Sequence, residues 1–68
     1  MTDSGYCQIK TNERDGIYVI TLDRPEARNA INSAMWAELC DAFAYFDRSS
    51  HLAVAILTNT GKVFCAGA

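Results

Sequence analysis

Leu52-Ala53-Val54-Ala55-Ile56-Leu57 says more about the architecture than any other segment, because it is a continuous apolar run of strand length. Such a run is typical of a strand buried on both faces. It follows a short connection, Ser49-Ser50-His51, and before that residues 33–48 repeat apolar side chains at helical spacing. A buried strand after a helix predicts a right-handed β-α-β crossover within a layered sheet.

The helix predicted over residues 33–48 has both a cap and an apolar stripe. Asn32 or Ser33 can accept a hydrogen bond from a free amide of the first turn. Glu38 and Asp41 lie off the stripe, and we expect both carboxylates to be solvated. Seven side chains form the wide stripe, which we expect to pack in the core: Met35, Trp36, Leu39, Cys40, Ala42, Phe43 and Phe46.

Two strands are predicted before this helix. Residues 6–11 alternate weakly, and residues 17–22 are rich in β-branched and aromatic side chains. Asp15-Gly16 lies between them, where a hairpin turn needs positive φ. Pro25 ends the second strand, because proline restricts the residue before it and lacks an amide donor. With a short strand expected to start at Val63-Phe64, the order is β-β-α-β plus a stub, in the α/β (α+β) class.

Composition excludes several functions. The chain has 68 residues, half of them apolar, and a net charge of −2 with six scattered basic residues. It therefore predicts one small domain, or a piece of a larger one, and gives no electrostatic reason to bind nucleic acid. The longest apolar run is too short to span a membrane. The first five residues lack the basic and apolar parts of a secretory signal, so we expect none.

The cysteines and the single histidine argue against a metal site. The chain has three cysteines, an odd number, and they are widely spaced: Cys7, Cys40 and Cys65. We expect all three to be reduced thiols in a cytoplasmic protein, with no metal bound. His51 sits at a connection between two predicted elements and is expected to be solvated. Cys65 has no histidine near it in sequence, so we expect it to fill a tight space rather than act as a nucleophile.

Two segments remain as candidates for a ligand site: residues 24–32 and residues 64–68. Each follows a predicted strand and offers small residues, whose backbone can approach a ligand closely. Ligands of open α/β sheets favour the crevice at the carboxyl ends of strands. Thr60-Gly61-Lys62 does not complete a phosphate-binding loop, because Ile56 and Val63 stand where that motif needs glycine and a hydroxyl residue. A turn is the better interpretation of it.

Three segments together resemble the crotonase family, the enoyl-CoA hydratase/isomerase superfamily. Residues 20–31 resemble the family's strand-then-loop signature, residues 54–58 its buried second strand, and residues 61–68 its small-residue segment. They occur in the family's order and spacing. The resemblance covers nearly the whole chain from Ile9, but about the first third of a family member. It implies that residues 1–68 are the N-terminal fragment of a single crotonase-like domain, the first β-β-α-β unit of the ClpP/crotonase spiral fold.

The resemblance also implies a binding site for an acyl-CoA thioester, bent between two loops. The side chain of Arg28 can attract the phosphates of this ligand, or it can be solvated. Three residues would line the pantetheine and nucleotide part through their backbone: Ala27, Arg28 and Ala30. Two would flank the ligand from the other side: Ala66 and Gly67. Ala68 would donate its amide N–H to the thioester oxygen, as one of the two donors of an oxyanion hole.

The implied chemistry is stabilisation of an enolate, and the reaction expected is the hydration of a trans-2-enoyl-CoA in fatty acid metabolism. Fixed N–H donors favour the negative charge that grows on the thioester oxygen. Coenzyme A enters as part of the substrate, so no separate cofactor is expected, and the full-length parent is expected to be a homotrimer or hexamer. The second oxyanion donor and the two glutamates of family hydratases lie further along the family's chain. We therefore expect the 68-residue chain alone to be inactive and to associate or partly unfold.

An alternative interpretation is a free-standing, non-enzymatic module that keeps part of the acyl-CoA grip or serves in assembly. It predicts a monomeric chain that folds cooperatively on its own. The two interpretations differ in whether a longer protein carries the chemistry.

Overall fold

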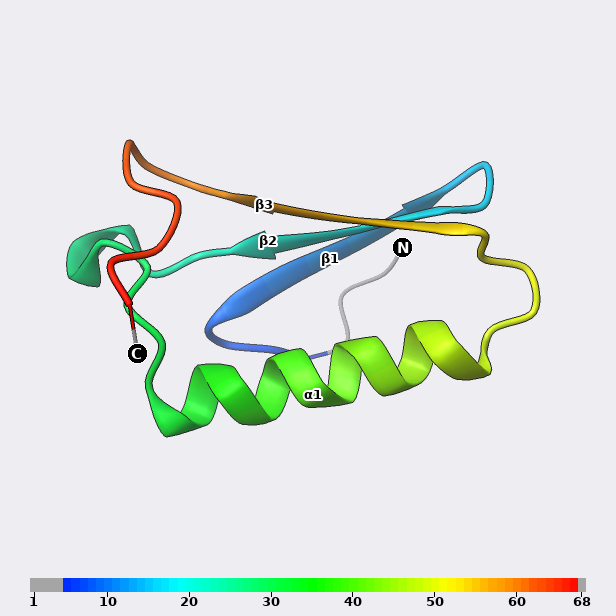
Figure 1. Cartoon of the computed structure of the whole chain (residues 1–68), viewed down its shortest axis with the longest axis horizontal. Helices are drawn as coiled ribbons and strands as arrows, with labels where there is room; N and C mark the ends of the chain where they lie inside the picture. Colours follow the sequence, from blue (N-terminus) through cyan, green and yellow to red (C-terminus); the bar gives the residue numbers. More distant parts are fainter. Residues whose placement is uncertain (1–4, 68) are drawn as a thin grey trace.

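A β hairpin begins the fold in the computed structural model, which describes residues 5–67 (Figure 1). Strand β1 (Ile9–Arg14) pairs antiparallel with β2 (Ile17–Leu22), and Arg14 stands opposite Ile17. The two residues between them, Asp15 and Gly16, have φ angles of 53° and 80°. Positive φ at both central positions is what a two-residue hairpin turn requires, so the predicted turn is confirmed. Strand β1 itself lies further along the chain than predicted.

A crossover connects β2 to the third strand. After a 3-10 turn, η1 (Pro25–Ala27), the chain forms helix α1 (Ser33–Arg48) and then β3 (Val54–Asn59). The side chain of Asn32 caps α1 by accepting from the amide of Met35 at 2.8 Å. Strand β3 runs parallel to β2, so the sheet order is β1-β2-β3 and the predicted β-β-α-β unit is confirmed. In this part of the chain, no helix is long and apolar enough to cross a membrane.

The core lies between the sheet and α1, which runs along one face (Figure 1). Alternate residues of β2 point inward, as expected for a strand with one covered face. Tyr18 is the largest of them, and its ring stacks on that of Phe46 with 6.3 Å between centroids. The buried apolar residues are Ile9, Tyr18, Ile20, Leu22, Met35, Leu39, Ala42 and Leu52.

The apolar stripe of α1 is wider than the area of the sheet against which the helix packs. Met35, Leu39 and Ala42 are buried at helical spacing, as predicted. Trp36 and Phe43, in contrast, are 61% and 43% exposed, and Cys40 is exposed as well, so the prediction that these three belong to the core is wrong for this chain. Each lies one residue further round the helix than a buried neighbour. Three strands are too narrow a sheet to reach that side of α1.

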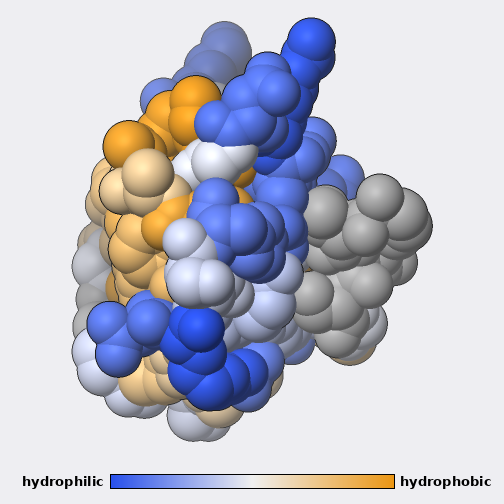
Figure 2. Space-filling view, turned by 90° about the vertical axis from the view of Figure 1, so that its right-hand side faces the viewer, coloured by the Kyte–Doolittle hydropathy of each residue, from blue (hydrophilic) through white to orange (hydrophobic). Residues whose placement is uncertain are grey.

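Strand β3 is also more exposed than its sequence predicts. Val54, Ile56 and Leu57 are 50%, 45% and 41% exposed, so burial on both faces is wrong for this chain. The physical reason is position, because β3 is an edge of the sheet and its outer face has no second layer among residues 5–67. Figure 2 shows hydrophobic surface gathered along one side of the molecule, with hydrophilic residues beside it.

The predicted short strand at Val63-Phe64 is not formed. The segment that contains it is irregular in the structure, with no strand hydrogen bonding. Its backbone instead pairs with the loop after β2, since Ala66 donates its amide to the carbonyl oxygen of Arg28 at 3.0 Å. The loop after β2 thus bonds to backbone groups of this segment that would otherwise pair with a neighbouring strand.

Glu38 is half-buried and hydrogen-bonded, contrary to the prediction that it is solvated, whereas Asp41 is exposed as predicted but is also paired. Glu38 accepts backbone hydrogen bonds from Cys7, Gln8 and Ile9 at 2.9, 2.7 and 3.1 Å. Asp41 accepts from the hydroxyl of Tyr6 at 2.5 Å. Burial and this neighbouring carboxylate raise the pKa of Tyr6. Both carboxylates therefore hold the segment before β1 against α1.

A polar cluster lies at the end of the sheet opposite to the carboxyl ends of β2 and β3. The carboxylate of Glu13 accepts from the hydroxyl of Tyr45 and lies 2.8 Å from Nε2 of His51. These two contacts, the Tyr45 bond first, hold the pKa of Glu13 below its ordinary value. The side chain of His51 is 60% exposed, so its predicted solvation is confirmed, but it is also paired.

Candidate functional site

The two candidate loops meet at one edge of the sheet. Strands β2 and β3 are parallel neighbours, with Leu22 opposite Asn59, so their carboxyl ends lie together. The loops that leave them, residues 23–32 and 60–67, therefore start side by side (Figure 1). The amide of Thr60 donates to the carbonyl oxygen of Leu22 at 2.9 Å and continues the ladder beyond the strands.

Backbone hydrogen bonds then join the loops directly. The amide of Ala66 donates to the carbonyl oxygen of Arg28 at 3.0 Å, and the amide of Ile31 donates to that of Gly67 at 2.8 Å. The loops thus exchange one bond in each direction. This arrangement keeps the small residues of both segments within reach of one bound molecule.

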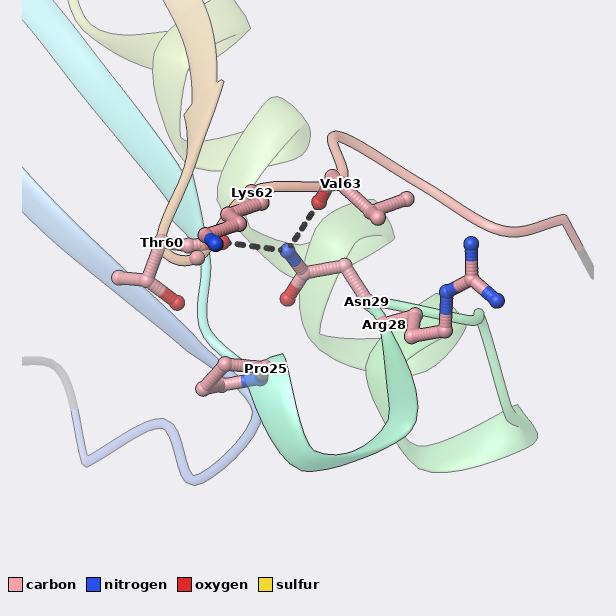
Figure 3. Close-up of a pocket in the computed structure, with 7 residues that line it drawn as sticks. Pro25, Arg28, Asn29, Thr60, Lys62 and Val63 are labelled. Carbon is pink, nitrogen blue, oxygen red and sulfur yellow. Dashed lines mark hydrogen bonds between the residues drawn. The ribbon is translucent and has the colours of Figure 1, made fainter.

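A cleft of about 240 Å³ lies between η1 and the turn after β3 (Figure 3). Two of its lining residues, Arg28 and Lys62, carry cationic side chains, and no lining residue is acidic. The guanidinium of Arg28 extends away from Pro25 and Thr60 (Figure 3). Gly61 brings the walls close, since a Cβ atom there would lie 3.2 Å from Cβ of Pro25. The absence of an acidic lining residue leaves the cleft compatible with an anionic group near its rim. The lining residues are Pro25, Arg28, Asn29, Thr60, Gly61, Lys62 and Val63.

The first loop uses much of its backbone internally. Ala27 and Ala30, both half-buried, are bonded to each other, since the amide of Ala30 donates to the carbonyl oxygen of Ala27 at 3.0 Å. The carbonyl oxygen of Ala30 accepts from Nη1 of Arg24 at 2.5 Å. Arg28 has a left-handed backbone, with φ of 54°, and an exposed side chain. Of the three residues predicted here, only Arg28 lines the cleft.

The second loop places Ala66 and Gly67 beside the first, as the backbone pairing shows. Their amides are already engaged, that of Ala66 by Arg28 and that of Gly67 by Sγ of Cys65 at 3.4 Å. Cys65 is half-buried against the core, in line with the predicted space-filling role. Ala68, the predicted oxyanion donor, lies outside the described residues, and the contact of all these residues with a ligand stays a prediction.

Two residues of the site were missed from sequence. Lys62 was interpreted as part of a turn, which it is, but its side chain also borders the cleft. Asn29 is 0% exposed and its side chain makes three hydrogen bonds, although it belongs to a polar loop. Asparagine's tolerance of left-handed backbone was the one local signal, and Asn29 has φ of 57°. Within residues 5–67, no three His, Cys, Asp or Glu side chains gather as ligands for a metal.

Comparison with known proteins agrees with this geometry. The family model for enoyl-CoA hydratase/isomerase matches residues 12–68. Mevalonyl-coenzyme A hydratase of Aspergillus fumigatus is 50% identical over 76% of the chain, and mouse mitochondrial Delta(3,5)-Delta(2,4)-dienoyl-CoA isomerase is 32% identical over 98%. The chain spans 19% and 21% of the length of these two relatives.

Solved structures show the same fold. An enoyl-CoA hydratase/isomerase from Mycobacterium paratuberculosis superposes with a TM-score of 0.91 at 33% identity, over 93% of this chain and 25% of that one. An enoyl-CoA hydratase from Mycobacterium tuberculosis gives 0.85 at 45% identity, over 88% and 24%. The sheet, the crossover and the two loops are therefore those of a crotonase fold. The chain belongs to the enoyl-CoA hydratase/isomerase family, the crotonase superfamily.

Proposed function

We propose that residues 1–68 form the amino-terminal part of a crotonase-type enzyme and supply half of its acyl-CoA site. The observation that carries the proposal is the pair of loops, bonded to each other through Ala66 and Ile31 beside a cleft that two cations border. An extended thioester with a phosphate-rich end matches both parts. The relatives named above support a CoA thioester as the substrate class, because each is named for one.

In this proposal the cleft receives phosphate groups of coenzyme A. Arg28 offers a planar guanidinium that can bond two phosphate oxygens, and Lys62 adds a mobile point charge. The backbone of Ala27, Arg28 and Ala30 lines the pantetheine and nucleotide part, with Ala66 and Gly67 on the other side. Coenzyme A belongs to the substrate, and no further cofactor is invoked.

The acyl end would reach the amide of Ala68, one of two donors to the thioester oxygen. Such a donor acts only when negative charge grows on that oxygen, and losing one costs about 2.7–4 kcal/mol. We propose hydration of a trans-2-enoyl-CoA in fatty acid metabolism as the reaction of the whole protein, a homotrimer or hexamer. The chain of 68 residues would bind without turnover, because the second donor and the acid–base glutamates are expected elsewhere. The cytoplasmic location stays a prediction.

Calorimetric titration of the whole protein, in which residues 1–68 have their full surroundings, tests the binding step. We expect a CoA thioester to bind, and the double change R28A/K62A to weaken it about 30-fold, with roughly 1 kcal/mol for each phosphate contact. A pantetheine thioester lacks these phosphates, so its affinity should not change between the two proteins. Equal affinity of both proteins for the CoA thioester would refute phosphate binding in the cleft.

Measurements of intact mass and of turnover distinguish the proposed enzyme from the non-enzymatic alternative. An intact mass several times that of 68 residues, measured on protein from its natural source, would support the enzyme. A hydration assay on the 68-residue chain with an enoyl-CoA should show no product. Turnover by this chain would overturn the proposed division of the site.

A further inference from the structure

Asn29 combines two properties that seldom occur together in a loop residue. Its side chain is polar, yet the residue is 0% exposed, and it is the one buried polar residue among residues 5–67. Its backbone is left-handed, with φ of 57°, directly after Arg28 with φ of 54°. Asparagine is among the few residues that adopt this conformation readily. The loop turns inward here and buries an amide group.

The amide group of Asn29 is bonded at both of its atoms. Oδ1 accepts from the amide of Arg24 at 2.7 Å, which closes the first loop on itself. Nδ2 donates to the carbonyl oxygens of Thr60 and Val63 at 2.7 and 2.8 Å, in the second loop (Figure 3). Nδ2 of the side chain therefore donates both of its hydrogen bonds to the neighbouring loop. Both acceptors are backbone atoms, so these bonds fix the course of the chain there.

These bonds lie between the cleft and the backbone pairing of the loops. Asn29 follows Arg28, which is a lining residue of the cleft and whose carbonyl oxygen accepts from the amide of Ala66. Its partners Thr60 and Val63 enclose Lys62 in sequence. A change in these bonds would therefore move both cations and the small-residue segment together.

We propose that Asn29 is a positioning residue, which sets the spacing of the two loops and so the width of the acyl-CoA site between them. The inference rests on the proposed function for its ligand. It assigns to Asn29 no contact with the substrate. The side chain acts through the backbone of residues 60–63, which carries Lys62 on one side and leads to Ala66 on the other.

Two variants test the inference. Asn29→Asp keeps the shape and the acceptor, but places carboxylate oxygen against two carbonyl oxygens. Asn29→Gly removes the side chain and tolerates the left-handed backbone, so it avoids burying a charge. Asn12→Asp is the matched control, since it makes the same chemical change at an exposed position of β1.

Hydrogen exchange and calorimetry provide the two readouts. We expect both Asn29 variants to lose protection at the amides of Ile31 and Ala66 by about tenfold or more, while the amide of Ile20 in β2 stays within twofold. We also expect their affinity for a CoA thioester to fall about tenfold or more, with Asn12→Asp unchanged. A general loss of stability would instead lower protection at all three amides together.

Each outcome decides the inference. Selective loss of protection and loss of affinity in Asn29→Gly support it. Unchanged protection at Ile31 and Ala66, uniform loss that includes Ile20, or unchanged affinity would overturn it. A whole wild-type protein that binds no CoA compound would overturn the proposed function, and with it the role of Asn29 in ligand affinity, whatever the exchange data show.

Discussion

Glu38 provides the sharpest test of how this small fold is held together. Its carboxylate projects from α1 and accepts hydrogen bonds from three consecutive amides, those of Cys7, Gln8 and Ile9. Replacing Glu38 by alanine removes all three acceptors at once. The segment before β1 would then lose its attachment to the helix.

The magnitude follows from the exposure of each bond. The bond from Cys7 is exposed, so water replaces the carboxylate there at little cost. The bonds from Gln8 and Ile9 are partly buried, and each contributes about 1 kcal/mol. We therefore expect Glu38→Ala to lower the free energy of unfolding by about 2 kcal/mol. Glu38→Gln keeps an oxygen for these two amides and should lose only about half of that.

Urea unfolding followed by circular dichroism measures this difference. Asp47→Ala is the control, because Asp47 is exposed on the same helix and the change also removes a carboxylate, with a somewhat larger gain in helix propensity than at Glu38. We expect Asp47→Ala to stay within about 0.5 kcal/mol of the wild type. If Glu38→Ala is as stable as this control, the three hydrogen bonds contribute nothing and the reasoning is refuted.

Three further predictions concern other parts of the chain. Asn32→Ala should lower stability by about 1 kcal/mol through loss of the helix cap, and Asn32→Asp should not; equal urea midpoints would contradict the cap. The lowered pKa of Glu13 stabilises the fold above pH 4.5, and this contribution is lost as the pH falls below that value. Melting temperatures of Glu13→Gln should therefore fall less on the acid side than those of the wild type, and parallel curves would argue against the Tyr45 bond. Gly61→Ala should cost about 1–2 kcal/mol, because φ is +75° and the new Cβ would crowd Pro25; an unchanged melting temperature would show that the turn adapts.

Local signals predicted the elements of this fold well. Asp15-Gly16 specifies a hairpin turn because only a few residues accept positive φ in succession. Asn32 marks the start of α1 because its side chain reaches an amide three residues along the same chain. Interactions of this kind are visible within a short window of sequence. The bounds of β2 followed from the same kind of evidence, whereas β1 lies further along the chain than predicted.

Burial was harder to predict, because it depends on what packs against an element. The apolar side chains of Val54 and Ile56 show that β3 suits an apolar environment, but not which surface provides it. Trp36 fits the helical period of the stripe, yet it lies beyond the width of the sheet. A pattern of side chains indicates the preferred surroundings of a residue and leaves the neighbours themselves undetermined.

Long-range polar contacts were the other gap. The loop that contains Asn29 was identified as part of a site, but Asn29 itself was not singled out. Its burial is decided by the carbonyl oxygens of Thr60 and Val63, which lie about half the chain away in sequence. Glu38 was misjudged for the same reason, since its partners are backbone amides that no side-chain pattern reveals.

The parallel pairing of β2 and β3 has a consequence for how the chain acquires its shape. These strands meet only after the intervening loop and the whole of α1 have been spanned, and such non-local contacts form slowly. The two loops come together only when that pairing exists. A compound that bridges them binds the native chain and not the unfolded one, and at 100 times its Kd it would add about 2.7 kcal/mol to stability. Ligand recognition and completion of the sheet are thus thermodynamically linked, and a rise in melting temperature with ligand concentration would report both.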